Sequence, residues 1–216
     1  MDKTKPIVAL FDFDGVVMDT ETQYYYFWKE VGDQYFPEIK DFSRIIKGST
    51  LVQIYDKYFQ GMEAEQAAIT AKLVEFEDHM TFNYVAGADD FLCVLREKKI
   101  PTAIVTSTNQ KKMANVYAAH PELKNLVDKV FTSEFFTRSK PFPDCFLMGA
   151  KELNTVPENC IVFEDSFHGL TAGNAAGMNV IGLSTTNPRE AIQDKCKLVI
   201  PDFTHFTYEE MLSVLD

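Results

Sequence analysis

Long hydrophobic runs and runs of basic residues are both missing from this 216-residue sequence. No stretch approaches the roughly 20 apolar residues that a membrane-spanning helix requires. The apolar run near the N-terminus, Ile7 to Phe11, is too short for the hydrophobic region of a signal peptide. The formal net charge is -11, which disfavours nucleic acid or a membrane as the main partner. An anionic substrate must therefore be attracted by local positive charge or by a metal.

Closely spaced cysteines are lacking as well. The four cysteines lie far apart, with no C-x-x-C pair and no neighbouring histidine that would indicate zinc; they are Cys93, Cys145, Cys160 and Cys196. The simplest interpretation is a reducing compartment, so we expect a cytoplasmic protein. Hydrophobic residues make up 46% and charged residues 25% of the chain, which is typical of a globular protein of one or two domains. A monomer is the default expectation.

Short apolar runs alternate with helical patterns along most of the chain. The expected strands are Ile7 to Phe11, 103–105, 129–131, 160–163, 180–183 and 198–200, and the expected helices are 89–98, 110–119, 143–153, 169–176 and 189–195. Most of these strands are continuous apolar runs, as in a parallel sheet that is covered on both faces. The sequence therefore predicts an α/β protein with a doubly wound, Rossmann-like parallel sheet.

The segment between about residues 21 and 82 interrupts this alternation, because it contains helical patterns but no convincing strand. In its clearest pattern, Ile69, Leu73, Phe76 and Met80 share one face of a helix. We expect a small all-α domain, residues 19–83, inserted into a core formed by residues 1–18 and 84–216. Linkers near residues 17–20 and 81–87 would join the two parts.

Two carboxylates follow the first expected strand in the stretch Asp12-Phe13-Asp14-Gly15. They leave a buried strand on the same side, and a glycine follows at once. Unpaired carboxylates are costly in such a place, so a cation should lie nearby. The alternative is an ordinary capping or ion-paired role, which the buried strand and the glycine disfavour. A metal site or a phosphate-binding site is the first hypothesis.

Three further polar clusters should meet these carboxylates, because ligands of open α/β sheets bind beyond the carboxyl ends of the strands. Residues 106–109 (Thr-Ser-Thr-Asn) follow the strand 103–105, and residues 164–166 (Glu-Asp-Ser) follow the strand 160–163. The run Lys140-Pro141-Phe142-Pro143-Asp144 opens a helix, with proline near its first turn. The four clusters come from distant parts of the chain and converge on one edge of the sheet.

In this order the clusters resemble the motifs of the haloacid dehalogenase (HAD) superfamily of phosphotransferases. Those motifs are Asp-x-Asp-Gly, a Thr or Ser after a strand, a Lys, and an acidic pair. Each is weak alone, but the four in order are specific, and the resemblance covers residues 7 to about 200. The inserted helices resemble the family's small α-helical cap, and the similarity is greatest to the β-phosphoglucomutase-like branch.

The resemblance implies a role for each residue. Asp12 would be the nucleophile that forms an aspartyl-phosphate, and Asp14 would be the general acid and base. Mg²⁺ would be held by Asp12, the backbone carbonyl of Asp14 and Asp165. Glu164 would be either a further metal ligand or a structural partner behind the site. Lys140 would place a positive charge beside the nucleophile and the transferring phosphoryl group.

A hydroxyl at Thr106 or Ser107 would bind the phosphate, together with the amides at the start of the next helix. Family members shift by one residue at this point, so both candidates stay open. Either hydroxyl could instead cap that helix. His168 lies four residues beyond Glu164, where a surface or hydrogen-bonded histidine is favoured over a proton shuttle.

The choice between phosphatase and mutase depends on the cap. In β-phosphoglucomutases a cap histidine follows the Asp-Thr pair by five residues, and a cap arginine grips the distal phosphate. The histidine position falls here on Tyr24, and the arginine should follow Lys47-Gly48, where the chain has Ser49, Thr50 and Leu51. A tyrosine hydroxyl, with a pKa of about 10, is a poor proton shuttle at neutral pH. Both departures favour hydrolysis.

The sequence thus predicts a Mg²⁺-dependent phosphatase acting on a small phosphorylated metabolite, such as a sugar phosphate. One alternative is a β-phosphoglucomutase-type isomerase. A non-catalytic phosphate-sensing module is disfavoured, because every catalytic side-chain type is present. The candidate substrate contacts are Glu21, Tyr24, Trp28, Lys47 and Ser49 in the cap and Thr108 and Asn109 in the core.

Overall fold

A single sheet of six parallel strands forms the centre of the molecule in the computed structural model, which describes residues 2–215. The strands are β1 (Val8–Phe11), β2 (Thr102–Val105), β3 (Lys129–Phe131), β4 (Cys160–Glu164), β5 (Asn179–Leu183) and β6 (Leu198–Ile200). Their order in the sheet is β3-β2-β1-β4-β5-β6, and every neighbouring pair is parallel. The predicted α/β class is confirmed, and each strand lies within one residue of its predicted bounds.

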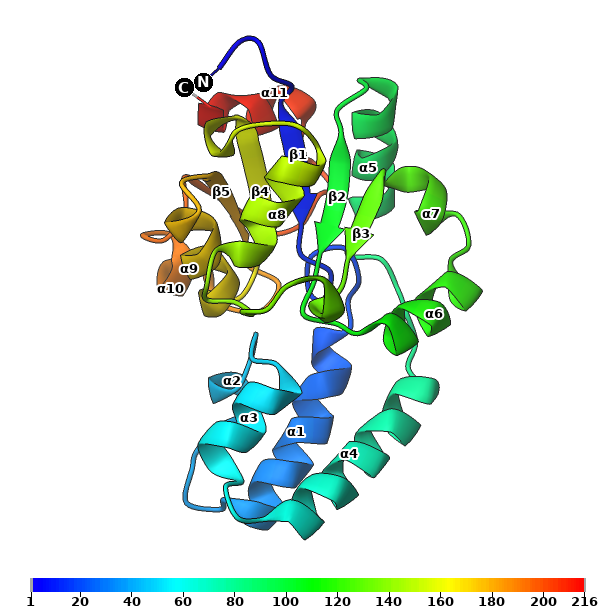
Figure 1. Cartoon of the computed structure of the whole chain (residues 1–216), viewed down its shortest axis with the longest axis vertical. Helices are drawn as coiled ribbons and strands as arrows, with labels where there is room; N and C mark the ends of the chain where they lie inside the picture. The colour runs from blue at the N-terminus through cyan, green and yellow to red at the C-terminus, as the bar shows by residue number, and fades with distance from the viewer. Residues whose placement is uncertain (1, 216) are drawn as a thin grey trace.

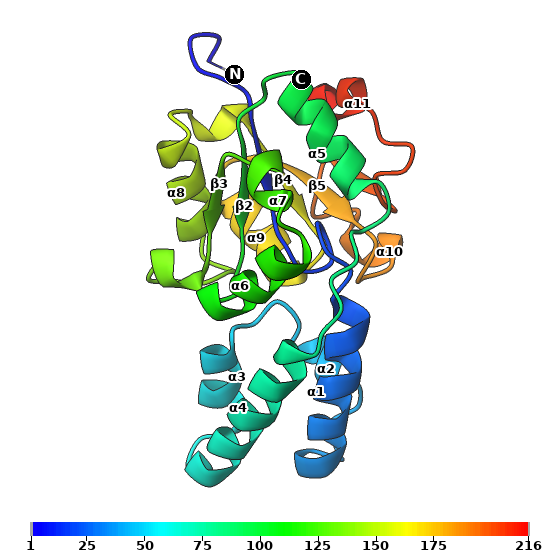
Figure 2. The same cartoon turned by 90° about the vertical axis from the view of Figure 1, so that its right-hand side faces the viewer.

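Helices cover both faces of the sheet because alternate residues of each strand point to opposite sides. Ala9 and Phe11 of β1 pack with α5 and α11, whereas Val8 and Leu10 pack with α8 and α9. Figure 2 shows this sandwich, with α8 on one side of the strands and α5 and α11 on the other. The core helices are α5 (Ala88–Glu97), α6 (Gln110–Ala119), α7 (Leu123–Leu126), α8 (Asp144–Glu152), α9 (Phe167–Ala175), α10 (Arg189–Ile192) and α11 (Tyr208–Leu212).

Three core helices differ from expectation. Helices α7 and α11 were not predicted, because elements of four and five residues are too short to show a helical period. Helix α10 ends at Ile192 rather than 195, because the chain turns back towards the sheet, where the Lys197 N–H donates to the carbonyl of Val180. Single 3₁₀ turns are formed by η1 (Ser133–Phe135), η2 (Pro157–Asn159) and η3 (Ser213–Leu215).

The inserted segment is entirely helical and lies beyond the carboxyl ends of the strands (Figure 1). Its helices are α1 (Glu21–Tyr35), α2 (Phe42–Ile45), α3 (Leu51–Tyr58) and α4 (Glu63–Asp78). They enclose a separate apolar core that includes Trp28, Ile54, Ile69 and Leu73. The predicted helical cap is therefore present, while its predicted limits at residues 19 and 83 stay a proposal.

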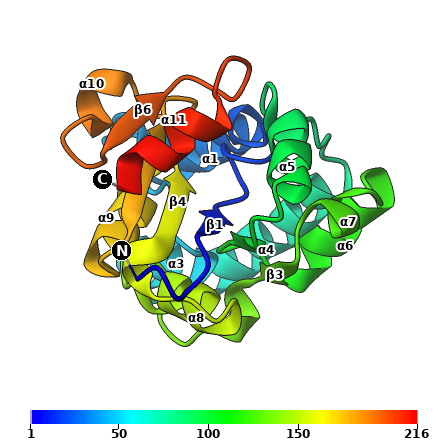
Figure 3. The same cartoon turned by 90° about the horizontal axis from the view of Figure 1, so that it is seen from above.

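The two linkers between core and cap lie side by side. Met18 forms an antiparallel bridge with Tyr84, and the Val85 N–H donates to the carbonyl of Val17 at 3.0 Å. Both connections therefore leave the core at one point, next to β1 (Figure 3). Within residues 2–215, no helix is long and apolar enough to cross a membrane.

Candidate active site

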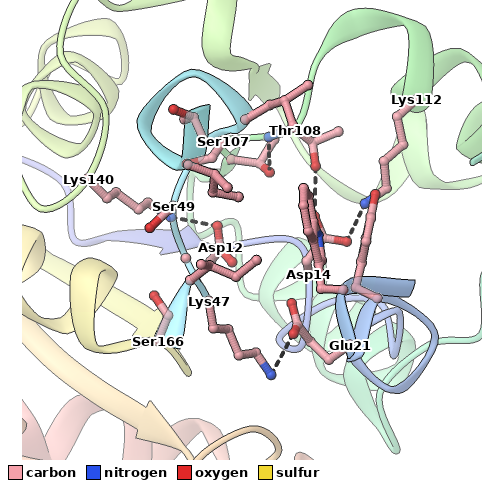
Figure 4. A pocket seen from close by; sticks show the side chains of 18 of the residues that line it. Asp12, Asp14, Glu21, Lys47, Ser49, Ser107, Thr108, Lys112, Lys140 and Ser166 are labelled. Atoms are coloured by element: carbon pink, nitrogen blue, oxygen red, sulfur yellow. Dashed lines mark hydrogen bonds and ion pairs between the residues drawn. The ribbon is translucent and has the colours of Figure 1, made fainter. Parts of the chain in front are cut away.

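The predicted polar clusters meet around a cavity of about 200 Å³ between the strand ends and the cap (Figure 4). The predicted site residues that line it are Asp12, Asp14, Glu21, Tyr24, Trp28, Lys47, Ser49, Thr106, Ser107, Thr108, Asn109, Lys140 and Asp165. Glu164 is the exception, because its side chain is fully buried behind the cavity wall. Segments as far apart as α1, the end of β1 and the end of β4 thus contribute to one cavity.

Lys140 joins the first aspartate to the acidic pair. Its ammonium group donates to Asp12 Oδ1 at 2.5 Å, to Glu164 Oε1 at 2.6 Å and to the Val105 carbonyl at 3.2 Å. Burial opposes the charge of Lys140, but the two carboxylates outweigh it and raise the pKa of the lysine. Burial, together with the charge of Glu164, raises the pKa of Asp12 to about 7 despite the attraction of Lys140. A second cation beside Asp12 would therefore stabilise its ionised carboxylate.

Glu164 is saturated with protein donors. Its Oε1 takes the Lys140 contact, and its Oε2 accepts from the backbone N–H groups of Asp165 and Ser166, both at 3.0 Å, and from the Ser166 hydroxyl at 3.1 Å. The backbone of α9 approaches so closely that a Cβ on Gly169 would lie 1.7 Å from Glu164 Oε1. These contacts favour the structural alternative for Glu164 over direct metal binding.

The carboxylates of Asp12 and Asp165 fit a divalent cation. With Glu164 they offer oxygens that all lie within 4.8 Å of one another. Lys140 donates to one oxygen of Asp12, and the Thr186 hydroxyl donates to one oxygen of Asp165. Within residues 2–215, no donor reaches the other oxygen of either carboxylate. Burial, followed by the charges of Glu21 and Glu164, raises the pKa of Asp165 well above its usual value. Such a set of buried, partly unpaired carboxylates is typical of a Mg²⁺ site.

A glycine makes this approach of carboxylates possible. Gly15 has a φ of +79°, and a Cβ at this position would lie 2.2 Å from Asp165 Oδ2. Any other residue would collide with Asp165 and would also strain the backbone. The glycine of the Asp-x-Asp-Gly stretch therefore brings the Asp165 carboxylate against the backbone next to Asp14.

Asp14 is held by a different lysine. Its Oδ1 accepts from Lys112 Nζ at 2.5 Å and from the Thr20 hydroxyl, and its Oδ2 accepts from the Thr108 hydroxyl at 2.7 Å. Burial alone would raise the pKa of Asp14, but Lys112 and these hydrogen bonds hold it below its usual value. Asp14 is therefore an ionised acceptor in this arrangement.

Lys112 was missed by the sequence analysis. Its side chain is only 2% exposed, and its ammonium group lies 4.4 Å from the centre of the Tyr24 ring. A lysine in the first turn of a helix is usually solvated. One signal was present, since Lys112 lies four residues before the buried Val116 and so shares a face of α6 with it.

The two candidate hydroxyls differ in what they already bind. Thr106 Oγ1 accepts from the Thr108 N–H at 3.0 Å. The Ser107 hydroxyl oxygen is buried and has no hydrogen-bond partner among the described residues, although Ser107 lines the cavity. Asn109 caps α6 by accepting from the Lys112 N–H at 2.8 Å. Ser107 is thus the better candidate for a hydroxyl that binds phosphate.

The polar candidates on the cap are mostly paired with other side chains. Lys47 Nζ lies 2.5 Å from Glu21 Oε2 and 2.6 Å from the Thr186 hydroxyl. The Tyr24 hydroxyl donates to Glu77 Oε1 at 2.8 Å. Glu77 also lines the cavity and was missed, because the helical pattern singled out its neighbours Phe76 and Met80 instead.

The remaining cap candidates lie as expected at the cavity. Ser49 lines it, and its hydroxyl lies 3.5 Å from Nδ1 of His168. His168 itself is half-buried and is not among the residues that line the cavity, in agreement with the prediction of a hydrogen-bonded histidine. Trp28 is 8% exposed and forms part of the cavity wall.

Known proteins resemble this chain in sequence and in fold. The model of the haloacid dehalogenase-like hydrolase family matches residues 9–183. The chain is 30% identical to the phosphorylated carbohydrates phosphatase of Thermotoga maritima, over 80% of this chain and 82% of that protein. It is 32% identical to hexitol phosphatase A of Escherichia coli, over 81% of this chain and 82% of that protein.

A solved structure, the β-phosphoglucomutase of Clostridium difficile, superposes with a TM-score of 0.79. The superposition covers 97% of each chain, and the two sequences are 24% identical, so this likeness concerns the fold alone. The family match extends from the first strand through the cap to β5, and the predicted motifs lie within it. This chain belongs to the haloacid dehalogenase-like hydrolase family.

Proposed function

We propose that this protein is a Mg²⁺-dependent phosphatase that hydrolyses a small phosphorylated metabolite, such as a sugar phosphate, through an aspartyl-phosphate on Asp12. The class of enzyme, a phosphoric monoester hydrolase, follows from family membership and from relatives that act on phosphorylated carbohydrates and on a hexitol phosphate. The observation that carries the mechanism is the 2.5 Å contact between Lys140 and Asp12 at the cavity wall. Asp12 therefore lies beside a fixed positive charge, and its second carboxylate oxygen is available to attack a substrate.

In the first step the available oxygen of Asp12 attacks phosphorus, and the bond from phosphorus to the leaving oxygen breaks. Lys140 reduces the repulsion between the two anions. The Ser107 hydroxyl would donate to the phosphate oxygens. The predicted help from the amides at the start of α6 is limited, because the Gln110 N–H already donates to Glu134 and the Lys112 N–H to Asn109. Asp14 starts ionised, so it first gives up one of its present donors and takes up a proton from solvent, and it then transfers that proton to the leaving oxygen.

In the second step water attacks the phosphorus of the aspartyl-phosphate and regenerates Asp12. Asp14 accepts the proton of that water, a role that suits the ionised state in which Lys112 and Thr108 hold it. The products are inorganic phosphate and an alcohol. Glu164 takes no part in bond making and holds Lys140 and the start of α9 in place.

Asp12, Asp165 and the backbone carbonyl of Asp14 would hold Mg²⁺. When bound, the ion supplies positive charge that offsets the repulsion between the nucleophile and a phosphate dianion. The raised pKa of Asp165, caused first by burial, and the close approach that Gly15 allows both support this assignment.

A mutase is the second candidate, and the contacts of the cap disfavour it. The Tyr24 hydroxyl, at the position of the mutase histidine, donates to Glu77, and burial raises the pKa of Tyr24 further above its usual value. Leu51 lies in the cavity wall where the resemblance places an arginine, and Lys47 is paired with Glu21. Tyr24 is therefore not available to shuttle a proton, and neither Leu51 nor Lys47 is available to bind a second phosphate.

The test is phosphate release from p-nitrophenyl phosphate by the purified protein, with Mg²⁺ and after its removal by a chelator. We expect activity that requires the ion and that is lost in Asp12→Asn. Glucose phosphate interconversion should be slower than phosphate release. A protein that binds phosphate without turnover would contradict the proposal and favour a sensing module, whereas faster interconversion would favour the mutase.

A further inference from the structure

We propose that Glu77 determines specificity, and that the substrate is the monophosphate of a neutral, polyhydroxyl compound without a second anionic group. This inference rests on the proposed function, because it concerns the leaving group of that reaction. It follows from three features of the cavity: its paired cations, the carboxylate of Glu77 and an apolar wall on the cap.

Every cation in the wall of the cavity already has a carboxylate partner. The cations are three lysines and no arginine, among the residues that the structure describes. Lys140 lies 2.5 Å from Asp12, Lys112 lies 2.5 Å from Asp14, and Lys47 lies 2.5 Å from Glu21. The reacting phosphate is served by Lys140, so a second phosphate on the substrate would have no unpaired cation to bind.

Glu77 adds a negative charge on the cap side of the same cavity. Its Oε1 accepts from the Tyr24 hydroxyl at 2.8 Å, and no side chain or amide in residues 2–215 donates to its Oε2. A carboxylate oxygen without a donor accepts hydrogen bonds from hydroxyl groups and repels phosphate. Glu77 therefore favours a hydroxylated leaving group and opposes an anionic one.

The apolar wall completes this description of the leaving group. Trp28, Ile54 and Leu73 are each less than 10% exposed in the cap core, and they form part of the cavity wall. A sugar or polyol has C–H groups that pack against an indole ring and hydroxyls that point to a polar partner. One such molecule can therefore contact Trp28 and Glu77 together while its single phosphate lies at Asp12.

A matched pair of substrates tests the inference in the wild-type protein with Mg²⁺. Fructose 1-phosphate and fructose 1,6-bisphosphate differ only by the second phosphate. We expect kcat/KM to be about tenfold or more higher for the monophosphate, because a like charge at Glu77 disfavours the second phosphate. Equal values, or a preference for the bisphosphate, would overturn the inference.

Variants of Glu77 then separate its two effects. Glu77→Gln keeps an acceptor and removes the charge, so the preference for the monophosphate should fall about fivefold. Glu77→Leu removes the acceptor, so KM for fructose 1-phosphate should rise about tenfold with a smaller change in kcat. Glu75→Gln is the matched control, because Glu75 is exposed on the same helix, does not line this cavity and should change neither value.

If the Glu77 variants leave both values unchanged, Glu77 does not set specificity and the inference is overturned. If a variant fails to fold, as judged from its thermal unfolding, the wild-type preference decides alone. Turnover of p-nitrophenyl phosphate distinguishes failure of the proposed phosphatase function from failure of the role of Glu77 in specificity. Turnover combined with the wrong preference overturns only this inference, whereas no turnover of any ester overturns the proposed function and this inference with it.

Discussion

The two aspartates of the Asp-x-Asp-Gly stretch are paired with two different buried lysines. Lys140 contacts Asp12 and Lys112 contacts Asp14, each at 2.5 Å, and both lysine side chains are 2% exposed. Among residues 2–215, one oxygen of Asp12 has no donor, whereas both oxygens of Asp14 accept hydrogen bonds. In the proposed mechanism, the difference between the nucleophile Asp12 and the proton carrier Asp14 therefore arises from the neighbours of two chemically identical side chains.

The ion pair of Lys112 and Asp14 should be visible in stability. Lys112→Met leaves the Asp14 carboxylate without its cation, so the free energy of unfolding should fall by about 2–4 kcal/mol. Asp14→Asn combined with Lys112→Met should cost less than the sum of the two single changes, because the pair is removed together. Denaturant unfolding of the four proteins measures this coupling. Additive losses would show that the contact contributes nothing.

Ser107 and Thr106 should respond differently to truncation. Ser107→Ala removes a buried hydroxyl that has no partner in the described part of the chain, so kcat/KM should fall about tenfold or more while the unfolding temperature changes little. Thr106→Ala instead removes the acceptor of the Thr108 N–H, so its cost should appear mainly in stability. Steady-state kinetics and thermal unfolding of both variants decide which hydroxyl binds the phosphate. The reverse pattern would assign the role to Thr106.

At the scale of elements, the strands could be predicted closely because each is a short apolar run between polar turns. The candidate site residues could be located for the same reason, since Asp12 and Asp165 come directly after β1 and β4. Helices α7 and α11 could not be predicted, because a single turn is stabilised by tertiary packing of residues such as Leu123 and Met211 rather than by its own pattern.

The cap-side half of the cavity was harder to predict than the strand ends. Lys112 and Glu77 are charged helix residues of the kind that solvent usually surrounds. Lys112 is buried and Glu77 is half-buried because α4 of the cap lies against α6 of the core. The sequence of one helix carries little information about which other helix will cover it. Tyr24 was located correctly, but its partner Glu77 lies 53 positions away along the chain.

The start of α3 connects the cap to the catalytic lysine. Gln53 Nε2 donates to the Lys140 carbonyl at 3.0 Å, while Gln53 Oε1 accepts from the Thr50 N–H in the capping box of α3. Gln53→Glu keeps the capping acceptor but replaces the donor by an anion that faces the carbonyl. We expect KM to rise about fivefold, because a hydrogen bond between the cap and the core beside the cavity is lost.

Steady-state kinetics measures this effect, and Gln60→Glu is the matched control. Gln60 is an exposed residue of the cap, and its side-chain amide contacts only the nearby Asp56 carbonyl. An unchanged KM in Gln53→Glu, or an equal rise in both variants, would show that the loss of this contact does not raise KM.

At the scale of the whole molecule, the site concentrates negative charge in a protein that is already acidic, with a formal net charge of -11. Asp12, Asp14, Glu164 and Asp165 all lie at the ends of β1 and β4, and Lys140 balances only part of their charge. The fold places these carboxylates next to each other through the parallel pairing of β1 with β4. Carboxylates held this close repel one another, and a divalent cation at the proposed site would offset that repulsion.

Mg²⁺ affinity should therefore depend on pH. The pKa of Asp12 is raised to about 7, chiefly by burial, and that of Asp165 is also raised. Below these pKa values the carboxyls hold protons that the ion must displace, so binding should tighten between about pH 5 and pH 8 and should release protons. Calorimetry in buffers of different ionisation enthalpy measures both effects. Affinity that is independent of pH, or proton uptake on binding, would contradict the assignment of these ligands.

Rapid quenching of the reaction tests whether a covalent phosphoryl group forms on Asp12. A substrate with a radiolabelled phosphate is mixed with the protein and Mg²⁺, the reaction is stopped by acid within one turnover, and label on the denatured chain is counted. We expect label that hydroxylamine removes, that maps to the peptide containing Asp12, and that is absent in Asp12→Asn. Turnover without any label on the chain, or label that persists in Asp12→Asn, would contradict this expectation.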